Sequence, residues 1–318
     1  MVRAVFTKEI AMHVIFGAGP VGSGTALRLA AEGRRVRVVT RSGSGPDAVE
    51  RIAADAADPD AVAKVTAGAD VIYNCVNPPQ YDTWVKDWPP VAANLLAAAE
   101  DSGAVLVTMG NLYGYGPVDH PMREGDPLAS TETKGKIRAQ MWADALAAHR
   151  AGRVRATEAR ASDFFGPGLT DTSHLGSLVV PRVLNGKTVR VQGSPDQPHT
   201  WTYIDDVSRL LAVLGTDDRA WGRAWHVPSG PPLTQRQAVA ALARAAGVSA
   251  PKVSGSPRWL FRAGGVFSGQ MRELAGVHYQ WDRPFVMDSS AATDTFGIEP
   301  TPQDEAMAAT VAWWREKR

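Results

Sequence analysis

The chain has 318 residues, of which 44% are hydrophobic, and this is enough for a packed core in one large domain or two smaller ones. Its 34 basic and 33 acidic residues leave a net charge of +1, which argues against a nucleic acid or a membrane surface as a partner. No apolar run approaches the roughly 18–20 residues that cross a bilayer. We therefore expect a cytoplasmic protein that acts on a small molecule.

The reactive side chains exclude several classes of site. The chain has one cysteine, Cys75, so an internal disulfide and a zinc–thiolate cage are both excluded. Histidines and carboxylates do not cluster at the spacing of metal ligands, so no metal is expected. The serines show no Gly-x-Ser-x-Gly elbow, which disfavours a hydrolase.

Strand and helix patterns alternate through the first half of the chain. Strands are predicted at 13–16, 35–39, 50–53, 71–75, 104–108 and 153–160, and helices at 20–32, 58–66, 91–102 and 131–150. Alternation of this kind builds a parallel sheet with helices on both faces. The glycine- and serine-rich residues 42–46 predict a loop in place of a helix between the second and third strands.

The composition changes after residue 166, where proline, glycine and tryptophan become frequent and the predicted helices are separated by longer irregular stretches, at 175–185, 205–214, 235–246 and 302–315. We therefore predict an α/β fold, a Rossmann-like doubly wound parallel sheet with a smaller, discontinuous C-terminal substrate domain. Residues 1–165 would form the coenzyme-binding domain, with 200–222 returning to it. Residues 166–318 would form most of the substrate-binding domain.

The most informative motif is Gly17-Ala18-Gly19-Pro20-Val21-Gly22, which stands between the first strand and the first helix. Gly17 permits the tight turn, Gly19 lets the backbone approach a pyrophosphate, and Gly22 lets the helix pack on the strand. Pro20 and Val21 begin the helix, whose free N–H groups can bind phosphate. The order of strand, glycines and helix therefore predicts a dinucleotide site.

The end of the second strand indicates which dinucleotide binds. NAD-binding versions of this fold carry an acidic residue about 20 positions after the glycines, which holds the ribose 2′-hydroxyl. Here the strand ends Val39-Thr40-Arg41-Ser42, with no carboxylate. Arg41 can pair with a 2′-phosphate, and Ser42 can donate a hydrogen bond to it. We therefore predict NADP as the coenzyme, with NAD as the alternative.

Further segments follow the order of one known family. They are Asn74-Cys75-Val76-Asn77-Pro78, Leu112-Tyr113-Gly114, Arg160-Ala161-Ser162-Asp163-Phe164-Phe165-Gly166-Pro167-Gly168, Trp201-Thr202-Tyr203-Ile204-Asp205-Asp206-Val207 and Thr295-Phe296-Gly297-Ile298-Glu299-Pro300. Together with the glycine turn, they resemble the extended, epimerase/dehydratase-like branch of the short-chain dehydrogenase/reductase superfamily over nearly the whole chain. The resemblance implies that Asp55 contacts adenine, that Asn77 lines the central region of the coenzyme, and that two helices, 91–102 and 131–150, form a homodimer.

The chain departs from this family at the catalytic positions. Members carry Tyr-x-x-x-Lys, in which the lysine holds the ribose and lowers the pKa of the tyrosine. Lys136 fits the family lysine, which implies the ribose contact, but Glu132 stands four residues before it. If Lys134 is the match instead, its partner is Ser130. Neither alignment contains the tyrosine.

The family's upstream serine or threonine is also missing. Its position falls on Met109, with Thr108 and Asn111 as polar neighbours. Thr108 is therefore a candidate for this role, and Glu132 and Tyr113 are candidate proton carriers. Burial could raise the pKa of Glu132 into a useful range. Tyr115 and Tyr81 are further tyrosines that could reach the nicotinamide.

Three hypotheses follow for the function, and the sequence leaves all three open. In the first, the chain is an NADP-dependent oxidoreductase, or redox-assisted epimerase, that acts on a small or medium carbonyl or imine substrate with a rebuilt acid/base. In the second hypothesis the substrate is already activated for hydride transfer, so the protein has to supply little proton transfer. In the third the protein binds NADP without turnover, as a redox sensor or binding module. Loop histidines such as His120 and His174 could also face the cleft.

Overall fold

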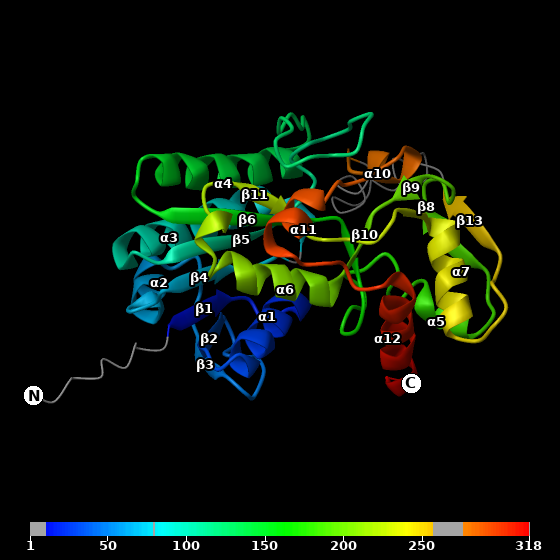
Figure 1. Ribbon diagram of the computed structural model, residues 1–318, viewed down its shortest axis with the longest axis horizontal. Coiled ribbons are helices and arrows are strands. Elements are labelled where there is room, and N and C mark those ends of the chain that lie inside the picture. The colour runs from blue at the N-terminus through cyan, green and yellow to red at the C-terminus, as the bar shows by residue number, and fades with distance from the viewer. Residues whose placement is uncertain (1–10, 79, 257–275, 318) are drawn as a thin grey trace, which may run out of the picture.

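The computed structural model describes residues 11–78, 80–256 and 276–317. At its centre is a parallel sheet in the order β11-β6-β5-β4-β1-β2-β3 (Figure 1). Its strands are β1 (Met12–Phe16), β2 (Arg35–Thr40), β3 (Glu50–Ala53), β4 (Val71–Asn74), β5 (Val105–Asn111), β6 (Arg155–Ala161) and β11 (Ala224–His226). The order reverses at β1, which lies between β4 and β2. In sheets of this kind ligands bind outside the carboxyl ends of the strands at such a reversal.

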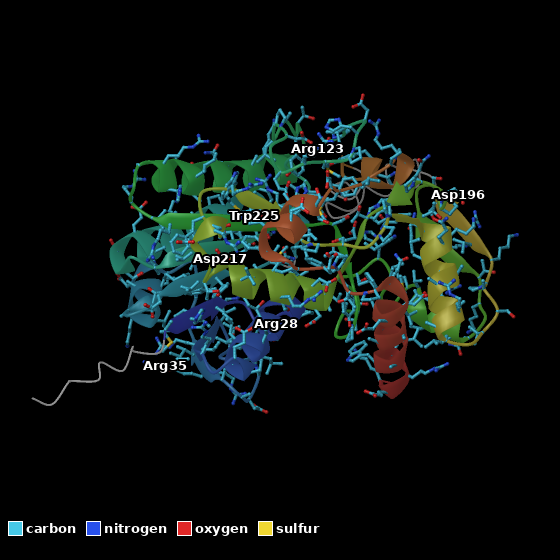
Figure 2. All side chains as sticks on the ribbon, in the orientation of Figure 1. Arg28, Arg35, Arg123, Asp196, Asp217 and Trp225 are labelled. Carbon is cyan, nitrogen blue, oxygen red and sulfur yellow. The ribbon has the colours of Figure 1, made fainter. Side chains whose placement is uncertain are left out.

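Helices cover both faces of the sheet, so the expected doubly wound architecture is confirmed. One face carries α1 (Pro20–Ala31) and α6 (Ile204–Leu214), and the other carries α2 (Pro59–Thr66), α3 (Trp84–Ser102) and α4 (Thr133–Arg150) (Figure 1). Alternate residues of β1 supply the two cores, because Val14 and Phe16 face α3 while Ile15 faces α1. Arg28 of α1, labelled in Figure 2, pairs with Asp205 of α6 at 2.9 Å.

A third core lies beyond the carboxyl edge of the sheet. It packs α5 (Val180–Leu184), α7 (Gln235–Ala245) and α12 (Gln303–Glu316) against the paired strands β8 (Val189–Gln192) and β13 (Val253–Ser256). Two of its residues, Phe165 and Trp201, come from β7 (Asp163–Phe165) and β10 (Trp201–Tyr203), which pair in parallel and join the two parts of the molecule. The chain then returns to the sheet through α6 and β11, where Trp225 is buried (Figure 2).

Short elements complete the described part of the chain. They are η1 (Tyr81–Thr83), β9 (Pro198–His199), η2 (Asp218–Ala220), β12 (Leu233–Thr234), α10 (Tyr279–Asp282) and α11 (Ser290–Phe296). Strands β9 and β12 form a small antiparallel pair. The residues between β2 and β3 are all described by the structure and form no helix. This agrees with the loop predicted from the glycine- and serine-rich residues 42–46.

Two predicted helices differ from those observed. Helix α3 begins at Trp84 and continues through Pro89 and Pro90, whereas the sequence predicted a start at residue 91. The side chains of Trp84 and Trp88 are almost completely buried, and this burial opposes the cost of proline inside a helix. The predicted helix at 175–185 is confined to Val180–Leu184, because residues before it form tight turns around Thr170.

Candidate coenzyme and catalytic site

The glycine turn after β1 has the close backbone packing that a dinucleotide site needs. Gly17 has φ of +100°, a left-handed conformation that favours glycine, and its N–H donates to the carbonyl of Val39 at 2.9 Å. A Cβ on Gly22 would lie only 2.0 Å from the carbonyl oxygen of Gly17. Any side chain at Gly22 would therefore push α1 away from the turn.

Gly19 marks the open side of the turn. A Cβ built on Gly19 would have no heavy atom of the described residues within 4 Å, so space for a ligand remains directly against the backbone. Gly19 is also the N-cap of α1, and none of the described side chains caps the first N–H groups of this helix. Pro20 is exposed and Val21 half-buried at the helix start. This arrangement fits the diphosphate of a dinucleotide.

The expected adenine-side residues lie at the carboxyl ends of β2 and β3. Arg41 is exposed, and Ser42 donates a hydrogen bond from its Oγ to Ser44 Oγ at 2.9 Å. Asp55 is exposed and accepts a hydrogen bond from the N–H of Ala57 at 3.0 Å. The structure therefore places these three side chains on the surface beside one edge of the sheet, and their contacts with a coenzyme stay predictions.

The loop after β4 is held by an arginine that the sequence analysis did not single out. Arg138 of α4 donates to the side chain of Asn77 at 3.4 Å and to the carbonyl of Met109 at 3.1 Å. Its guanidinium lies 4.2 Å from the ring centre of Trp88 and 5.2 Å from that of Trp84. Arg138 is thus a buried clamp between β5 and the loop that carries Asn77.

The start of α4 discriminates between the two possible lysines. Lys134 is only 1% exposed, on the same face of α4 as Arg138 and Trp142, whereas Lys136 lies on the exposed face. A helix turns by about 100° per residue, so two lysines two positions apart point away from each other. This placement argues against the ribose contact expected for Lys136 and favours the alternative alignment with Lys134.

Ser130, the partner of Lys134 in that alignment, is buried just before α4. Its N–H donates to the carbonyl of Gly114 at 3.0 Å, and its buried Oγ has no hydrogen-bond partner among the described residues. Gly135 makes this approach feasible, because a Cβ there would lie 2.1 Å from Ser130 Oγ and 2.4 Å from the carbonyl oxygen of Tyr113. Ser130 therefore presents an unsatisfied buried hydroxyl four residues before Lys134, the spacing of the alternative alignment.

Glu132 is half-buried at the N-cap of α4, but its side chain does not cap the helix. Its carboxylate lies instead against the C-terminal segment, where a Cβ on Gly276 would be 2.7 Å from Oε2. Burial, with a smaller contribution from the Glu132 charge, raises the pKa of nearby Tyr279. Glu132 thus lies against Gly276, which is far from it in the sequence.

The other catalytic candidates lie around β5. Thr108 is buried and, like Leu106, points toward α3 and α4. Tyr113 is half-buried and packs near Trp84, with ring centres 6.4 Å apart. The side chain of Tyr81 lies outside the described part of the structure. These positions leave Thr108 and Tyr113 as candidates near α4 without testing their roles.

Tyr115 does not serve as the expected nicotinamide contact, because it belongs to a buried polar network. Its hydroxyl lies 2.7 Å from Arg160 Nη1 and 2.7 Å from His226 Nε2, and Arg160 pairs with Glu158 at 2.5 Å. Burial raises the pKa of Tyr115 to about 12. The side chain is 2% exposed and is committed to the interior.

The described residues contain neither a metal cluster nor a membrane-spanning helix. No group of three or more histidine, cysteine or acidic side chains in residues 11–78, 80–256 and 276–317 could hold a metal ion. Over the same ranges, none of the helices is long and apolar enough to cross a membrane.

Comparison with solved structures identifies the fold. The chain is similar to MoeE5 in complex with UDP-glucose and NAD, with a TM-score of 0.79 and 19% identity over 96% of this chain and 99% of that one. It is similar to dTDP-glucose 4,6-dehydratase from Bacillus anthracis str. Ames in complex with NAD, with a TM-score of 0.78 and 16% identity over 97% of each chain. UDP-glucose 4-epimerase from Thermus thermophilus in complex with NAD gives a TM-score of 0.75 and 18% identity, over 96% of this chain and 99% of the epimerase.

The sequence itself carries the family assignment. No curated protein matches it significantly. The model of the NAD-dependent epimerase/dehydratase family, however, matches residues 13–226, which is more than half of the 318 residues. This match confirms the expected resemblance and the expectation of an enzyme with a nicotinamide-nucleotide fold. The chain belongs to the NAD-dependent epimerase/dehydratase family.

Proposed function

We propose that this chain is an NADP-dependent oxidoreductase, or a redox-assisted epimerase, that acts on a carbonyl or imine substrate or on the corresponding alcohol or amine. The observation that carries the proposal is the burial of Lys134 at the start of α4, where the adjacent Gly135 packs against the unsatisfied hydroxyl of Ser130. Both lie on the sheet edge at which the glycine turn opens, so coenzyme and catalytic groups would share one cleft.

The coenzyme would lie across the order reversal of the sheet. Backbone N–H groups around Gly19 would hold its diphosphate, and Asn77 would line its central region. At the adenine end Arg41 and Ser42 would bind the 2′-phosphate, while Asp55 would contact the base. When bound, the nicotinamide donates or accepts hydride.

Lys134 would hold the nicotinamide ribose, because it is the lysine that α4 buries. The Ser130 hydroxyl would donate a hydrogen bond to the substrate oxygen, as the Oγ has no competing partner in the described part of the chain. A serine hydroxyl is a much weaker acid than a tyrosine, so proton transfer needs a further group. Glu132, Tyr113 and Thr108 are the candidates from the sequence.

The similar solved structures indicate which probes to include. Their bound molecules and names are those of nucleotide sugars, in MoeE5 with UDP-glucose and in the Thermus UDP-glucose 4-epimerase. A panel should therefore contain UDP-glucose and dTDP-glucose beside simple aldehydes, ketones and cyclic imines. Nucleotide sugars without a net redox change would be followed by product isomerisation.

A pair of lysine variants tests the assignment of the catalytic helix. We expect Lys134→Met to weaken NADPH binding by about tenfold or more, since a charged hydrogen bond contributes roughly 1.5–3 kcal/mol. Lys136→Met, the matched control on the same helix, should bind NADPH like the unmodified protein. Fluorescence titration measures both. Equal losses would contradict the Lys134 assignment.

Turnover of the panel decides between the catalytic and non-catalytic hypotheses. Oxidation of NADPH, or isomerisation of a nucleotide sugar with the oxidised coenzyme present, would support the proposed enzyme. Tight coenzyme binding with no turnover of any probe would favour the binding module instead, as the missing tyrosine allows.

A further inference from the structure

A buried carboxylate with two histidines stands beyond β6, outside the residues already assigned. Asp163 of β7 lies 2.8 Å from His199 Nε2 through Oδ2, and 3.4 Å from His174 Nε2 through Oδ1. The ring of His199 stacks on Trp281 at 4.3 Å, with 8° between the planes, and His174 lies 4.2 Å from the same ring. Two segments distant in the sequence therefore bring a histidine to one carboxylate, and a third packs Trp281 on both imidazole rings.

The inner histidine fixes the orientation of the carboxylate. His199 is 1% exposed, and its Nδ1 is buried with no hydrogen-bond partner among the residues that the structure describes. A proton on Nδ1 would have no acceptor there, so the favoured tautomer carries its proton on Nε2 and donates it to Asp163. One oxygen of Asp163 is thus occupied, and the other is left to face His174.

The outer histidine is held in place, which is unusual for a loop residue. Ser173 before it is buried and donates from Oγ to the carbonyl of Phe164 at 2.7 Å, and Leu175 after it is 2% exposed. The next residue, Gly176, sits in a turn so tight that a Cβ would lie 1.8 Å from the carbonyl oxygen of Thr170. His174 itself keeps 29% of its side chain exposed.

The cluster lies on the side of the sheet toward which the nicotinamide would extend. The adenine-side residues follow β2 and β3, so the other half of the dinucleotide would extend over β4, β5 and β6. β7 follows β6 directly, and β6 pairs with β5 along its length. A Cβ on Gly168, in the same loop as His174, would lie 4.0 Å from Pro20 Cβ at the start of α1.

We propose that His174 is the proton-transfer residue that this chain uses in place of the missing tyrosine, with Asp163 as its positioning residue. This inference rests on the proposed function. His174 Nε2 lies 3.4 Å from Asp163 Oδ1, so the carboxylate favours the tautomer with its proton on Nε2, and the lone pair of Nδ1 on the other side of the ring would be available to a substrate hydroxyl.

In the oxidation direction the substrate would lose one proton and one hydride. The substrate O–H bond breaks and its proton moves to His174 Nδ1, while the adjacent C–H bond breaks and its electron pair leaves as hydride to the oxidised nicotinamide nucleotide. A C=O bond forms, and the imidazolium is stabilised by Asp163. Reduction is the reverse, with the imidazolium as the proton donor.

The charges around the pair favour this assignment. Burial lowers the pKa of His174, with a smaller lowering from His199, while Asp163 opposes the shift. Burial works to raise the pKa of Asp163, but the two imidazoles outweigh it and hold that pKa below its usual value. Near pH 7 the pair is therefore a carboxylate beside a neutral imidazole, which is the form a general base needs.

The tautomer of His174 can be measured without any substrate. In the full-length protein with saturating NADP⁺, ¹⁵N-histidine NMR near pH 7 should show His174, assigned through His174→Gln, as a neutral ring with its proton on Nε2. Asp163→Asn should move the His174 titration to lower pH, because it removes the charge that stabilises the imidazolium. A proton on Nδ1, or an unchanged titration, would overturn the proposal.

Turnover of UDP-glucose, dTDP-glucose or the carbonyl probe that reacts gives the second readout. His174→Gln should lower kcat by roughly 100-fold or more and leave the affinity for NADP⁺ unchanged. The fall of kcat at low pH, which is the acidic limb of its pH profile, should disappear in this variant. Asp163→Asn should move that limb to lower pH. His120→Gln is the matched control, since His120 also contacts carboxylates at 3.1 Å but is half exposed. An unchanged rate in His174→Gln would overturn the proposal, whereas failure of the unmodified protein to bind either coenzyme would overturn the proposed function instead.

Discussion

Gly19→Ala separates the ligand role of the glycine turn from its structural role. Gly19 has φ of −67°, which alanine adopts readily, and a Cβ there meets no atom of the described residues within 4 Å. Reduced freedom of the unfolded chain should stabilise the variant by about 0.4–1 kcal/mol. Alanine is a poorer N-cap than glycine by about half a kcal/mol. These effects nearly cancel, so we expect stability within roughly 0.5 kcal/mol of the unmodified protein.

Coenzyme binding should respond very differently. The added methyl group would occupy the space in which a diphosphate approaches the backbone, and loss of one charged hydrogen bond costs roughly 1.5–3 kcal/mol. Affinity for NADPH should therefore fall by about 10- to 100-fold. Isothermal titration calorimetry gives the affinity, and urea unfolding gives the stability.

Two further glycines provide the controls. Gly125 also has open space around a Cβ and does not cap a helix, so Gly125→Ala should leave NADPH affinity unchanged and stabilise the protein by about 0.4–1 kcal/mol. Gly22→Ala should lower the free energy of unfolding by about 1–3 kcal/mol, because its Cβ would lie 2.0 Å from the carbonyl oxygen of Gly17. If Gly19→Ala binds NADPH as tightly as the unmodified protein, the diphosphate does not lie against this turn.

Two other predictions concern the coenzyme and acid stability. Arg41→Ala should weaken NADPH binding about tenfold and leave NADH binding nearly unchanged, by fluorescence titration; parallel losses would contradict the phosphate contact. His13 is buried against Tyr73 Oη at 3.0 Å, and burial lowers its pKa to about 4. The unfolded chain binds this proton below about pH 6.5 and the native chain does not, so about 2 kcal/mol of stability should be lost by about pH 5. Urea unfolding should show a smaller loss in His13→Leu/Tyr73→Phe, and equal losses would refute this source.

The sheet could be predicted from the sequence because its strands are short apolar runs with clear breaks. Strand β3 has the predicted bounds, and the other five predicted strands begin or end within a few residues of the observed ones, whereas the edge strand β11 was not among the predicted strands. The start of α3 could not be predicted in the same way. Local rules place a helix after Pro90, whereas burial of Trp84 and Trp88 is a tertiary effect that extends it backward.

The glycine turn was also predictable, because its residues are consecutive and each has a local geometric role. The catalytic helix was not, since Lys134 and Lys136 fit the sequence pattern almost equally. Only the rotation of α4 relative to the sheet shows which lysine is buried. The contact between Glu132 and Gly276 and the convergence on Asp163 join segments that are distant in the chain, and no local pattern encodes such contacts.

The return of α6 to the sheet limits how this chain can be divided. Val207, Leu210 and Leu211 of α6 complete the apolar layer that α1 begins. A fragment ending at residue 165 would leave that layer facing water, and we expect such a fragment to aggregate. The N-terminal half therefore does not fold as an independent unit without α6. A chimera that exchanges the C-terminal half between relatives must keep α6 from the same parent as the glycine turn.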